Sequence, residues 1–361
     1  MTETGKAVTT AYYGQSPNYN YFSGCSRGGF QAMTEAQRYP KDYDGIIAAA
    51  PGINWPKYGA GRLWGQLSML LADNFIPACK FDAVTKAAVE ACDNIDGVED
   101  NIIGNPRLCQ YDPNNFVGAS IDNCGVFTLA DADIVRKSWQ GPRRMDGSFM
   151  WYGFTPGTSL EILNSTEEDA SSIRGPSTEW NQYFLSWHRY FLAQDPDLDL
   201  MSFTHGTFEG FWDQSVEQYS NILSADDPDL REFQKSGGKI IMWHGESDSV
   251  IPPAGSIDYY KRVERNFGTA KNVNSTLRLF MAPGVDHCGR GVGPSPVGLQ
   301  EVLVDWVENN IPPERIMSVS RDKETNEVIR SRPLCLYPKV ARYKGKGSSD
   351  DWANFECAEK Y

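Results

Sequence analysis

The sequence lacks several features that would place it in common classes of protein. No apolar run approaches the roughly eighteen residues that a membrane-spanning helix needs. Basic residues are too few for a nucleic-acid surface, because 47 Asp and Glu outnumber 34 Lys and Arg and give a net charge of −13. No two cysteines are spaced as CxxC, which argues against a zinc knuckle. We therefore expect no membrane, no nucleic acid and no structural zinc.

The N-terminus also lacks an apolar stretch resembling a signal peptide, since it reads MTETGK. Two features nevertheless indicate an oxidising secretory route: an even set of eight cysteines, and sequons at Asn164-Ser165-Thr166 and Asn274-Ser275-Thr276. Either the chain is cytosolic or its start is missing. We expect a secreted protein whose signal peptide is absent from this chain.

The apolar pattern predicts an α/β fold with an insertion. Residues 7–13 read as the end of a helix. Short apolar runs that end in turn residues are typical of parallel strands covered on both faces, and four occur, at 19–24, 45–50, 239–243 and 277–281. Between them the composition changes to many aromatic residues, four cysteines and Asp/Asn/Gly loops. The sequence therefore predicts a catalytic domain from 1–55 and 235–361, and an inserted lid domain from 56–234.

A candidate nucleophile lies where the first strand meets a helix expected over 29–39. Residues 24–28 read GCSRG and fit G-x-S-x-G, whose glycines allow the sharp turn that presents Ser26. The backbone N–H of Arg27 would face a developing oxyanion. Small-residue turns of this kind also arise by chance, so the assignment depends on partners.

A serine needs a histidine to take its proton and a carboxylate to orient that histidine. Among four histidines, His287 follows the last predicted strand directly. Asp248 follows the preceding strand and completes the chain order Ser, Asp, His. Asp286 and Glu246 compete as carboxylates, but the first adjoins the histidine and the second comes earlier in the turn. The remaining histidines are interpreted as structural or lid residues, namely His188, His205 and His244.

Two cysteines adjoin this predicted triad, since Cys25 precedes Ser26 and Cys288 follows His287. Bonded together, they would clamp base to nucleophile. Closing so long a loop is worth roughly 5 kcal/mol in the chain-entropy model. The alternative is two unrelated structural thiols.

These residues resemble the CS-D-HC arrangement of the tannase and feruloyl esterase family, and the resemblance extends over nearly the whole chain through 37–40 (QRYP), 44–46 (DGI) and a PLC…YPKVARYKG tail. It implies an α/β-hydrolase fold with a lid, hydrolysis of esters of plant phenolic acids, and secretion. Family members carry a long N-terminal portion with the first sheet strands and one oxyanion donor. We therefore expect the N-terminal strands to be missing from this chain.

An acidic loop, 92–102 (CDNIDGVEDNI), suits a hard cation with oxygen ligands but does not fit an EF-hand. The family resemblance implies a structural calcium held by the side chains of Asp93, Asp96 and Asp100 and the carbonyls of Val98 and Ile102. A solvated acidic turn is the alternative. By proximity and analogy we expect Cys79–Cys92 and Cys109–Cys124 disulfides around the loop, and Cys335–Cys357 to fix the tail.

Aromatic residues between 180 and 191 could stack on a phenolic ring, but Tyr183, Trp187 and Tyr190 or Phe191 have the spacing of one buried helix face. We favour core packing. The motifs thus predict a serine esterase, and the family resemblance implies that it acts on small or polysaccharide-linked aromatic esters, with feruloyl esterase activity favoured. Tannase activity is the alternative within the enzyme class, and a truncated, non-catalytic binding fragment is the alternative outside it.

Overall fold

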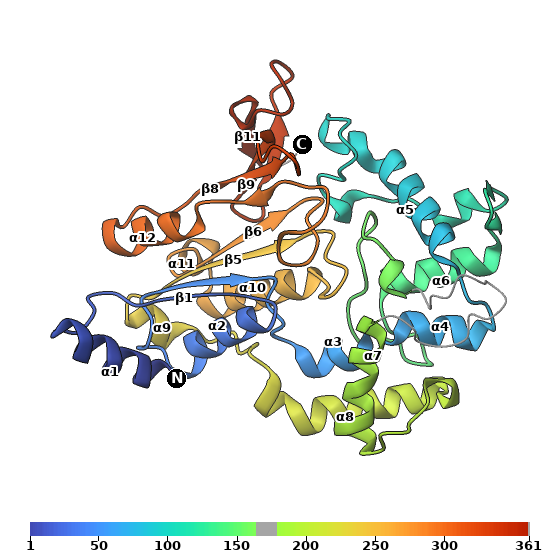
Figure 1. The fold of residues 1–361 in the computed structure, drawn as a ribbon, viewed down its shortest axis with the longest axis horizontal. Coiled ribbons are helices and arrows are strands. Elements are labelled where there is room, and N and C mark those ends of the chain that lie inside the picture. Colours follow the sequence, from blue (N-terminus) through green and yellow to red (C-terminus); the bar gives the residue numbers. More distant parts are fainter. Residues whose placement is uncertain (164–178, 360–361) are drawn as a thin grey trace.

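The structure is a computed structural model that describes residues 1–163 and 179–359 (Figure 1). The sequon at Asn164 lies outside these residues. In the described part of the chain a parallel sheet of four strands runs in the order β1-β2-β5-β6. Its strands are β1 (Tyr21–Cys25), β2 (Gly45–Ala49), β5 (Lys239–Gly245) and β6 (Leu277–Ala282). The prediction that four short apolar runs form one sheet is confirmed.

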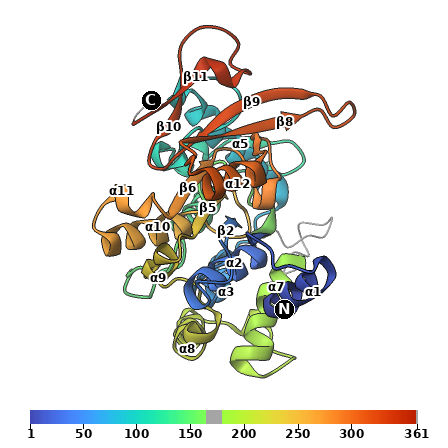
Figure 2. The ribbon, with the colours of Figure 1, turned by 90° about the vertical axis from the view of Figure 1, so that its left-hand side faces the viewer.

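Strands β2, β5 and β6 are buried on both faces, which is why they read as continuous apolar runs rather than as alternating patterns, whereas the edge strand β1 is only partly buried and exposes Ser23. Ile46 and Ala48 belong to the core packed against α2 (Arg27–Arg38) and α10 (Ala254–Phe267). Ile47 and Ala49, one residue out of phase, belong to the core under α12 (Leu299–Asn309). Figure 2 shows α2 and α12 on opposite sides of β2.

The chain between β2 and β5 is largely helical, and most of it lies beyond the carboxyl ends of the strands, whereas its last part, with α9 (Arg231–Lys235), packs beside α2 (Figure 1). It has a hydrophobic core of its own around Leu67, Phe81 and Phe127. Its longer helical elements are α3 (Trp55–Gly61), α4 (Trp64–Ala72), α5 (Ala78–Cys92), α6 (Leu129–Gln140), α7 (Glu179–Ser186), the π-helix η5 (Trp187–Ala193), α8 (His205–Leu223) and α9 (Arg231–Lys235). The core also takes in Val250 and Ile251 from the loop after β5, so the helical region packs against the sheet at that loop.

Smaller elements complete the described chain. At the N-terminus, α1 (Thr2–Tyr13) buries none of its residues. An antiparallel sheet joins β7 (Ser295–Pro296), β8 (Arg315–Arg321) and β9 (Val328–Cys335). The last two strands, β10 (Val340–Tyr343) and β11 (Phe355–Ala358), pair in antiparallel fashion. The short connecting elements are η1 (Asp93–Asp96), η2 (Pro106–Leu108), η3 (Pro113–Phe116), β3 (Ser120–Ile121), β4 (Gly125–Val126), η4 (Glu161–Leu163), η6 (Leu200–Ser202), α11 (Ala270–Val273), η7 (His287–Gly289) and η8 (Trp352–Asn354).

Among the described residues, no helix combines the length and apolar character needed to cross a bilayer.

The eight cysteines form four disulfides, and two of the four predicted pairs are correct. Cys25 bonds Cys288, and Cys335 bonds Cys357 across the tail. The expected Cys79–Cys92 and Cys109–Cys124 bridges are wrong, because the structure pairs Cys79 with Cys124 and Cys92 with Cys109. Cys79 and Cys92 lie at opposite ends of α5, which separates them by about 20 Å along the helix axis. A disulfide cannot span that distance.

Candidate active site

Ser26 occupies a sharp turn between β1 and α2, with φ +63° and ψ −115°. A positive φ is unusual for a residue with a side chain, and such strain persists only where neighbouring contacts enforce it. Ser26 N–H donates to the Ala49 carbonyl at 3.0 Å, while the Ser26 carbonyl accepts from Phe30 at 2.9 Å and Gly52 at 3.1 Å. These bonds hold the turn against the end of β2.

Close backbone approach requires glycine at two positions of this turn, Gly24 in the motif and Gly29 directly after it, whereas a Cβ at the second motif glycine, Gly28, would meet nothing within 4 Å. A Cβ at Gly24 would lie 2.5 Å from the backbone carbonyl of Gly28, and one at Gly29 would lie 2.5 Å from the Ala49 carbonyl oxygen. Both separations are too short for any side chain. Arg27 begins α2, so its N–H has no acceptor within the helix and lies next to Ser26. The turn therefore suits a nucleophile with an oxyanion donor beside it.

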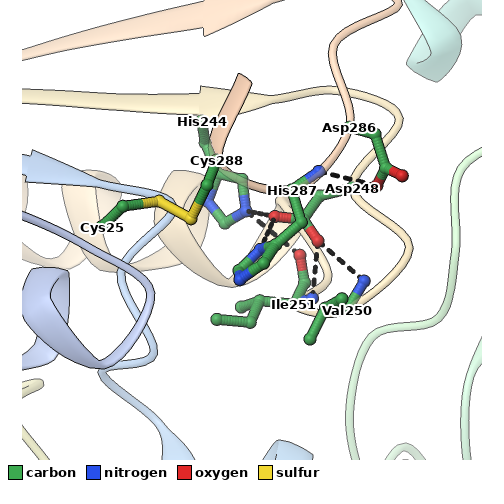
Figure 3. Close-up of a disulfide and its surroundings, with 8 residues drawn as sticks. All are labelled: Cys25, His244, Asp248, Val250, Ile251, Asp286, His287 and Cys288. Atoms are coloured by element: carbon green, nitrogen blue, oxygen red, sulfur yellow. Dashed lines mark hydrogen bonds and ion pairs between the residues drawn. A yellow bond between two sulfur atoms is a disulfide. The ribbon is translucent and has the colours of Figure 1, made fainter. Parts of the chain in front are cut away.

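His287 and Asp248 come together from the loops after β6 and β5. The Nδ1–H of His287 donates to Oδ2 of Asp248 at 2.8 Å (Figure 3). The Asp248 side chain is fully buried and that of His287 is 12% exposed. Because Nδ1 is committed to the carboxylate, Nε2 is the ring nitrogen left for proton transfer. This is the orientation that a general base requires.

Asp248 is held as a carboxylate by four donors. Oδ1 accepts the N–H groups of Val250 at 2.7 Å and Ile251 at 2.8 Å, and Oδ2 accepts from both His287 and His244. Burial alone raises the pKa of Asp248, but the hydrogen bonds from His244 and His287 outweigh it and hold that pKa well below its usual range. The group therefore stays ionised beside the imidazole.

His244 is a contact that sequence reasoning missed. It is fully buried on β5, where Nε2–H lies 3.1 Å from Asp248 Oδ2 and 3.1 Å from the Ile251 carbonyl, while Nδ1 accepts from the Ser256 hydroxyl at 2.8 Å. It is a structural residue, as expected, but its contact is with the candidate acid itself. The four-residue spacing between His244 and Asp248 was the available signal.

The Cys25–Cys288 disulfide joins the nucleophile turn to the histidine loop, with a Cα separation of 5.9 Å (Figure 3). The predicted clamp is confirmed. Each sulfur belongs to the immediate neighbour of Ser26 or His287, so the bond fixes how far apart these two residues can move. In the described chain the Ser26 hydroxyl makes no hydrogen bond to His287; such bonds often tighten only when substrate binds.

The rival carboxylates have other partners. Asp286 accepts the N–H groups of His287 and Ser249, each at 2.7 Å, and so stabilises the loop rather than the imidazole ring. Glu246 is buried and forms an ion pair with Arg107. Burial raises the pKa of Glu246, and Arg107 opposes that rise. Neither carboxylate is placed to orient His287 through its ring.

A cavity opens at Ser26, lined by Arg27, Trp55, Tyr58, Tyr183, Phe184, Val250 and Ile251. The expectation that residues 183–191 bury one helix face is only partly correct. Trp187 is buried, whereas Tyr190 and Phe191 are 58% and 49% exposed and Tyr183 lines the cavity. The cause is the change from α7 to the π-helix η5 at Trp187, which alters the spacing of side chains around the axis.

The other two histidines lie in the helical region, away from Ser26. His188 is fully buried, with Nδ1 3.0 Å from the Phe184 carbonyl, and burial lowers its pKa to about 4. The Nε2 of His205 lies 2.8 Å from the Arg143 carbonyl. Both have the structural surroundings that the sequence predicted.

The acidic loop follows α5 and turns at Gly97 with φ +83°. The Asp93 carboxylate accepts three N–H groups, from Asp100, Asn101 and Ile102, at 2.8 to 3.2 Å. Asp100 is paired with Arg332 at 2.7 Å. Burial raises the pKa of Asp96 to about 6, and the charges of Asp100 and Asp93 add to the rise.

The loop offers the oxygen donors that calcium prefers. Within the ranges 1–163 and 179–359, however, no three His, Cys, Asp or Glu side chains are grouped as metal ligands. The carboxylates of Asp93 and Asp100 are engaged by backbone N–H groups and by Arg332, respectively. Calcium binding by this loop stays a prediction.

The chain is similar in sequence and in fold to proteins named as esterases and acyl hydrolases. A probable feruloyl esterase of Arthroderma benhamiae is 39% identical over the whole chain, which covers 67% of that protein. The crystal structure of feruloyl esterase B from Aspergillus oryzae superposes with a TM-score of 0.86 at 27% identity, covering 99% of this chain and 72% of that one. Tannin acyl hydrolase from Aspergillus niger gives 0.87 at 25% identity, covering 99% and 68%.

The chain thus spans about two thirds of the length of these relatives. The family described as tannase and feruloyl esterase matches residues 1–358. Its named members here are carboxylic ester hydrolases. This chain belongs to the tannase and feruloyl esterase family.

Proposed function

We propose that this chain hydrolyses aromatic carboxylic esters through an acyl-enzyme on Ser26, on an α/β-hydrolase framework in which residues 56–234 act as a lid. The observation that carries the proposal is the Asp248–His287 hydrogen bond of 2.8 Å, tied to the Ser26 turn by the Cys25–Cys288 disulfide. A histidine that is oriented by a buried carboxylate and linked through a disulfide to the turn of a strained serine can activate that serine as a nucleophile. A purely structural role explains neither the strained φ nor the clamp.

In the proposed reaction the Ser26 hydroxyl gives its proton to Nε2 of His287 as Oγ attacks the ester carbonyl. The Arg27 N–H stabilises the oxyanion, and Asp248 stabilises the imidazolium. His287 then returns the proton to the leaving alcohol, which departs and leaves an acyl-serine. A water molecule, deprotonated by His287, attacks that acyl group, releases the carboxylic acid and restores the Ser26 hydroxyl.

The aromatic lining of the cavity supports an aromatic substrate, because Trp55, Tyr58 and Tyr183 offer ring faces and edges next to the nucleophile. The relatives named feruloyl esterase support feruloyl esters, small or polysaccharide-linked, as the proposed substrates of this chain, and the relative named tannin acyl hydrolase supports galloyl esters as the alternative. Four disulfides support secretion, where such plant material would be met.

Replacing the nucleophile tests the proposal. We expect Ser26→Ala to lower kcat/KM for methyl ferulate and methyl gallate by at least about a thousand-fold, since loss of a triad member usually costs several orders of magnitude. Ser23→Ala, an exposed neighbour on β1, is a matched control and should retain activity. Full activity in Ser26→Ala would remove the assignment, and the ratio of the two esters' kcat/KM separates feruloyl from galloyl specificity.

We also propose that the acidic loop binds a structural calcium, through Asp93, Asp96 and Asp100 with the carbonyls of Val98 and Ile102. The negative charges of Asp93 and Asp100 beside the partly buried Asp96 support this, because a bound cation would offset them. Saturating calcium should stabilise the chelated protein by about 2.7 kcal/mol at a hundred-fold excess over Kd, measured as a rise in Tm. Asp96→Asn should abolish the rise and the exposed Asp146→Asn should retain it. No calcium effect on the parent protein would contradict the site.

A further inference from the structure

Arg27 is an unusual cation for its position. Its side chain is exposed beside Ser26, and among the described residues no carboxylate pairs with it, although the protein as a whole carries a net charge of −13. Arg107 pairs with Glu246 in the loop after β5, whereas Arg62, which is buried and donates to the Ser249 carbonyl of that loop, has no carboxylate partner among the described residues either. The positive charge of Arg27 is therefore left for something else.

The guanidinium of Arg27 is held in place by aromatic side chains. Nε–H donates to the Tyr183 hydroxyl at 2.9 Å, and Nη2 donates to the same oxygen. The guanidinium carbon lies 5.0 Å from the centre of the Trp55 ring and 5.6 Å from that of Tyr183. Of the five N–H donors of a guanidinium, these bonds use two and leave three. The group is thus positioned yet still able to bind.

Arg27 also lies where two cavities adjoin. One contains Ser26, and the next continues past Phe30, Trp187 and Phe191. Both are lined by the same four residues, Arg27, Trp55, Tyr58 and Tyr183. An aromatic ester that occupies either cavity therefore lies in a space that the guanidinium helps to line.

We infer that Arg27 forms an anion subsite and that the preferred substrates are aromatic esters bearing a second, ionised carboxylate. A planar guanidinium matches a carboxylate through paired N–H donors, and the flanking rings accept the aromatic part of the same molecule. The inference rests on the proposed esterase function and adds the charge of the substrate to it. The competing interpretation is that Arg27 serves only to tie α2 to α7 through Tyr183.

Matched esters distinguish these interpretations. Monomethyl terephthalate and monomethyl isophthalate carry an anionic carboxylate, and the corresponding methyl carbamoylbenzoates replace it by a neutral amide of similar shape. We expect the parent protein to prefer the acid over its amide by about ten-fold in kcat/KM for at least one pair, after correction for alkaline hydrolysis rates. The preference should shrink as salt is added, because the subsite is exposed.

Variants then assign the preference to Arg27. Arg27→Gln should abolish the acid-to-amide ratio, Arg27→Lys should retain part of it, and Tyr183→Phe should retain most of it. An unchanged ratio in Arg27→Gln, or its equal loss in Tyr183→Phe, would overturn the inference. Hydrolysis of methyl ferulate without any acid preference would overturn the subsite alone, whereas a parent protein inactive on every ester would overturn the proposed function as well.

Discussion

Asp248 is the residue on which the geometry of the site depends. It receives backbone N–H groups on one oxygen and two imidazoles on the other, so it fixes the loop after β5 and the orientation of His287 together. The sequence order alone pointed to Asp248 and His287. It did not predict the contact between His244 and Asp248. A histidine inside a buried strand is usually a core residue, and only the structure shows that the loop after β5 brings Asp248 against the His244 ring.

The depressed pKa of Asp248 has a consequence for stability at low pH. A carboxyl whose folded pKa lies below its unfolded value of about 4 contributes stability that is present above that pH and is lost as the pH falls through the folded pKa. We expect Asp248→Asn to cost about 2 to 4 kcal/mol at pH 7, and the gap from the parent protein to narrow below about pH 4. Urea unfolding at pH 7 and pH 3.5 measures both values. An equal gap at the two pH values would show that the hydrogen bonds to the histidines do not depend on the charge.

At the scale of elements, local pattern predicted the strands but not the helical region. Three of the four runs of the main sheet are apolar on both faces, and all four are short and end in turn residues, so their length and the flanking turn residues were sufficient to predict the strands. The pairing of Cys79 could not be read from proximity, because a helix places nearby sequence positions far apart in space. The switch to a π-helix at Trp187 likewise leaves no periodic signal before it occurs, and it alters which aromatic side chains are buried.

The disulfide between the nucleophile turn and the histidine loop should matter more for activity than for folding of the sheet. Exposed loop contacts are weaker than those of the buried strands, so we expect Cys25→Ser with Cys288→Ser to lower kcat/KM at least about ten-fold while cooperative unfolding persists. Tm is expected to fall too, since the chain-entropy contribution of this bond is about 5 kcal/mol.

Removing the tail disulfide provides the control. Cys335→Ser with Cys357→Ser deletes a bond far along the chain from Ser26, and it should lower Tm while leaving kcat/KM within about two-fold of the parent value. If both double variants lose activity in proportion to Tm, the clamp has no special effect on the site. If the Cys25 and Cys288 variant keeps full activity, the histidine loop holds its position without it.

For the whole molecule, the sequence predicted which chemistry to expect better than which substrate. Residues separated by more than 200 positions meet at the strand ends because parallel strands present their carboxyl ends at one edge. The lining of the cavity could not be predicted from the sequence, because Trp55 and Tyr183 come from different helices whose packing no local pattern specifies. The relation of Arg27 to these rings therefore became visible only in the assembled structure.

The central claim is that the folded chain assembles an activated nucleophile at Ser26. Labelling with a fluorophosphonate tests it, because this reagent modifies a serine only when a base and an oxyanion site are in place. After labelling, reduction and trypsin digestion, we expect one adduct, on the peptide that ends at Arg27, and none in Ser26→Ala or in urea-unfolded protein. A cooperatively folded protein that stays unlabelled, or carries its adduct on another serine, would contradict the account and favour a non-catalytic binding protein.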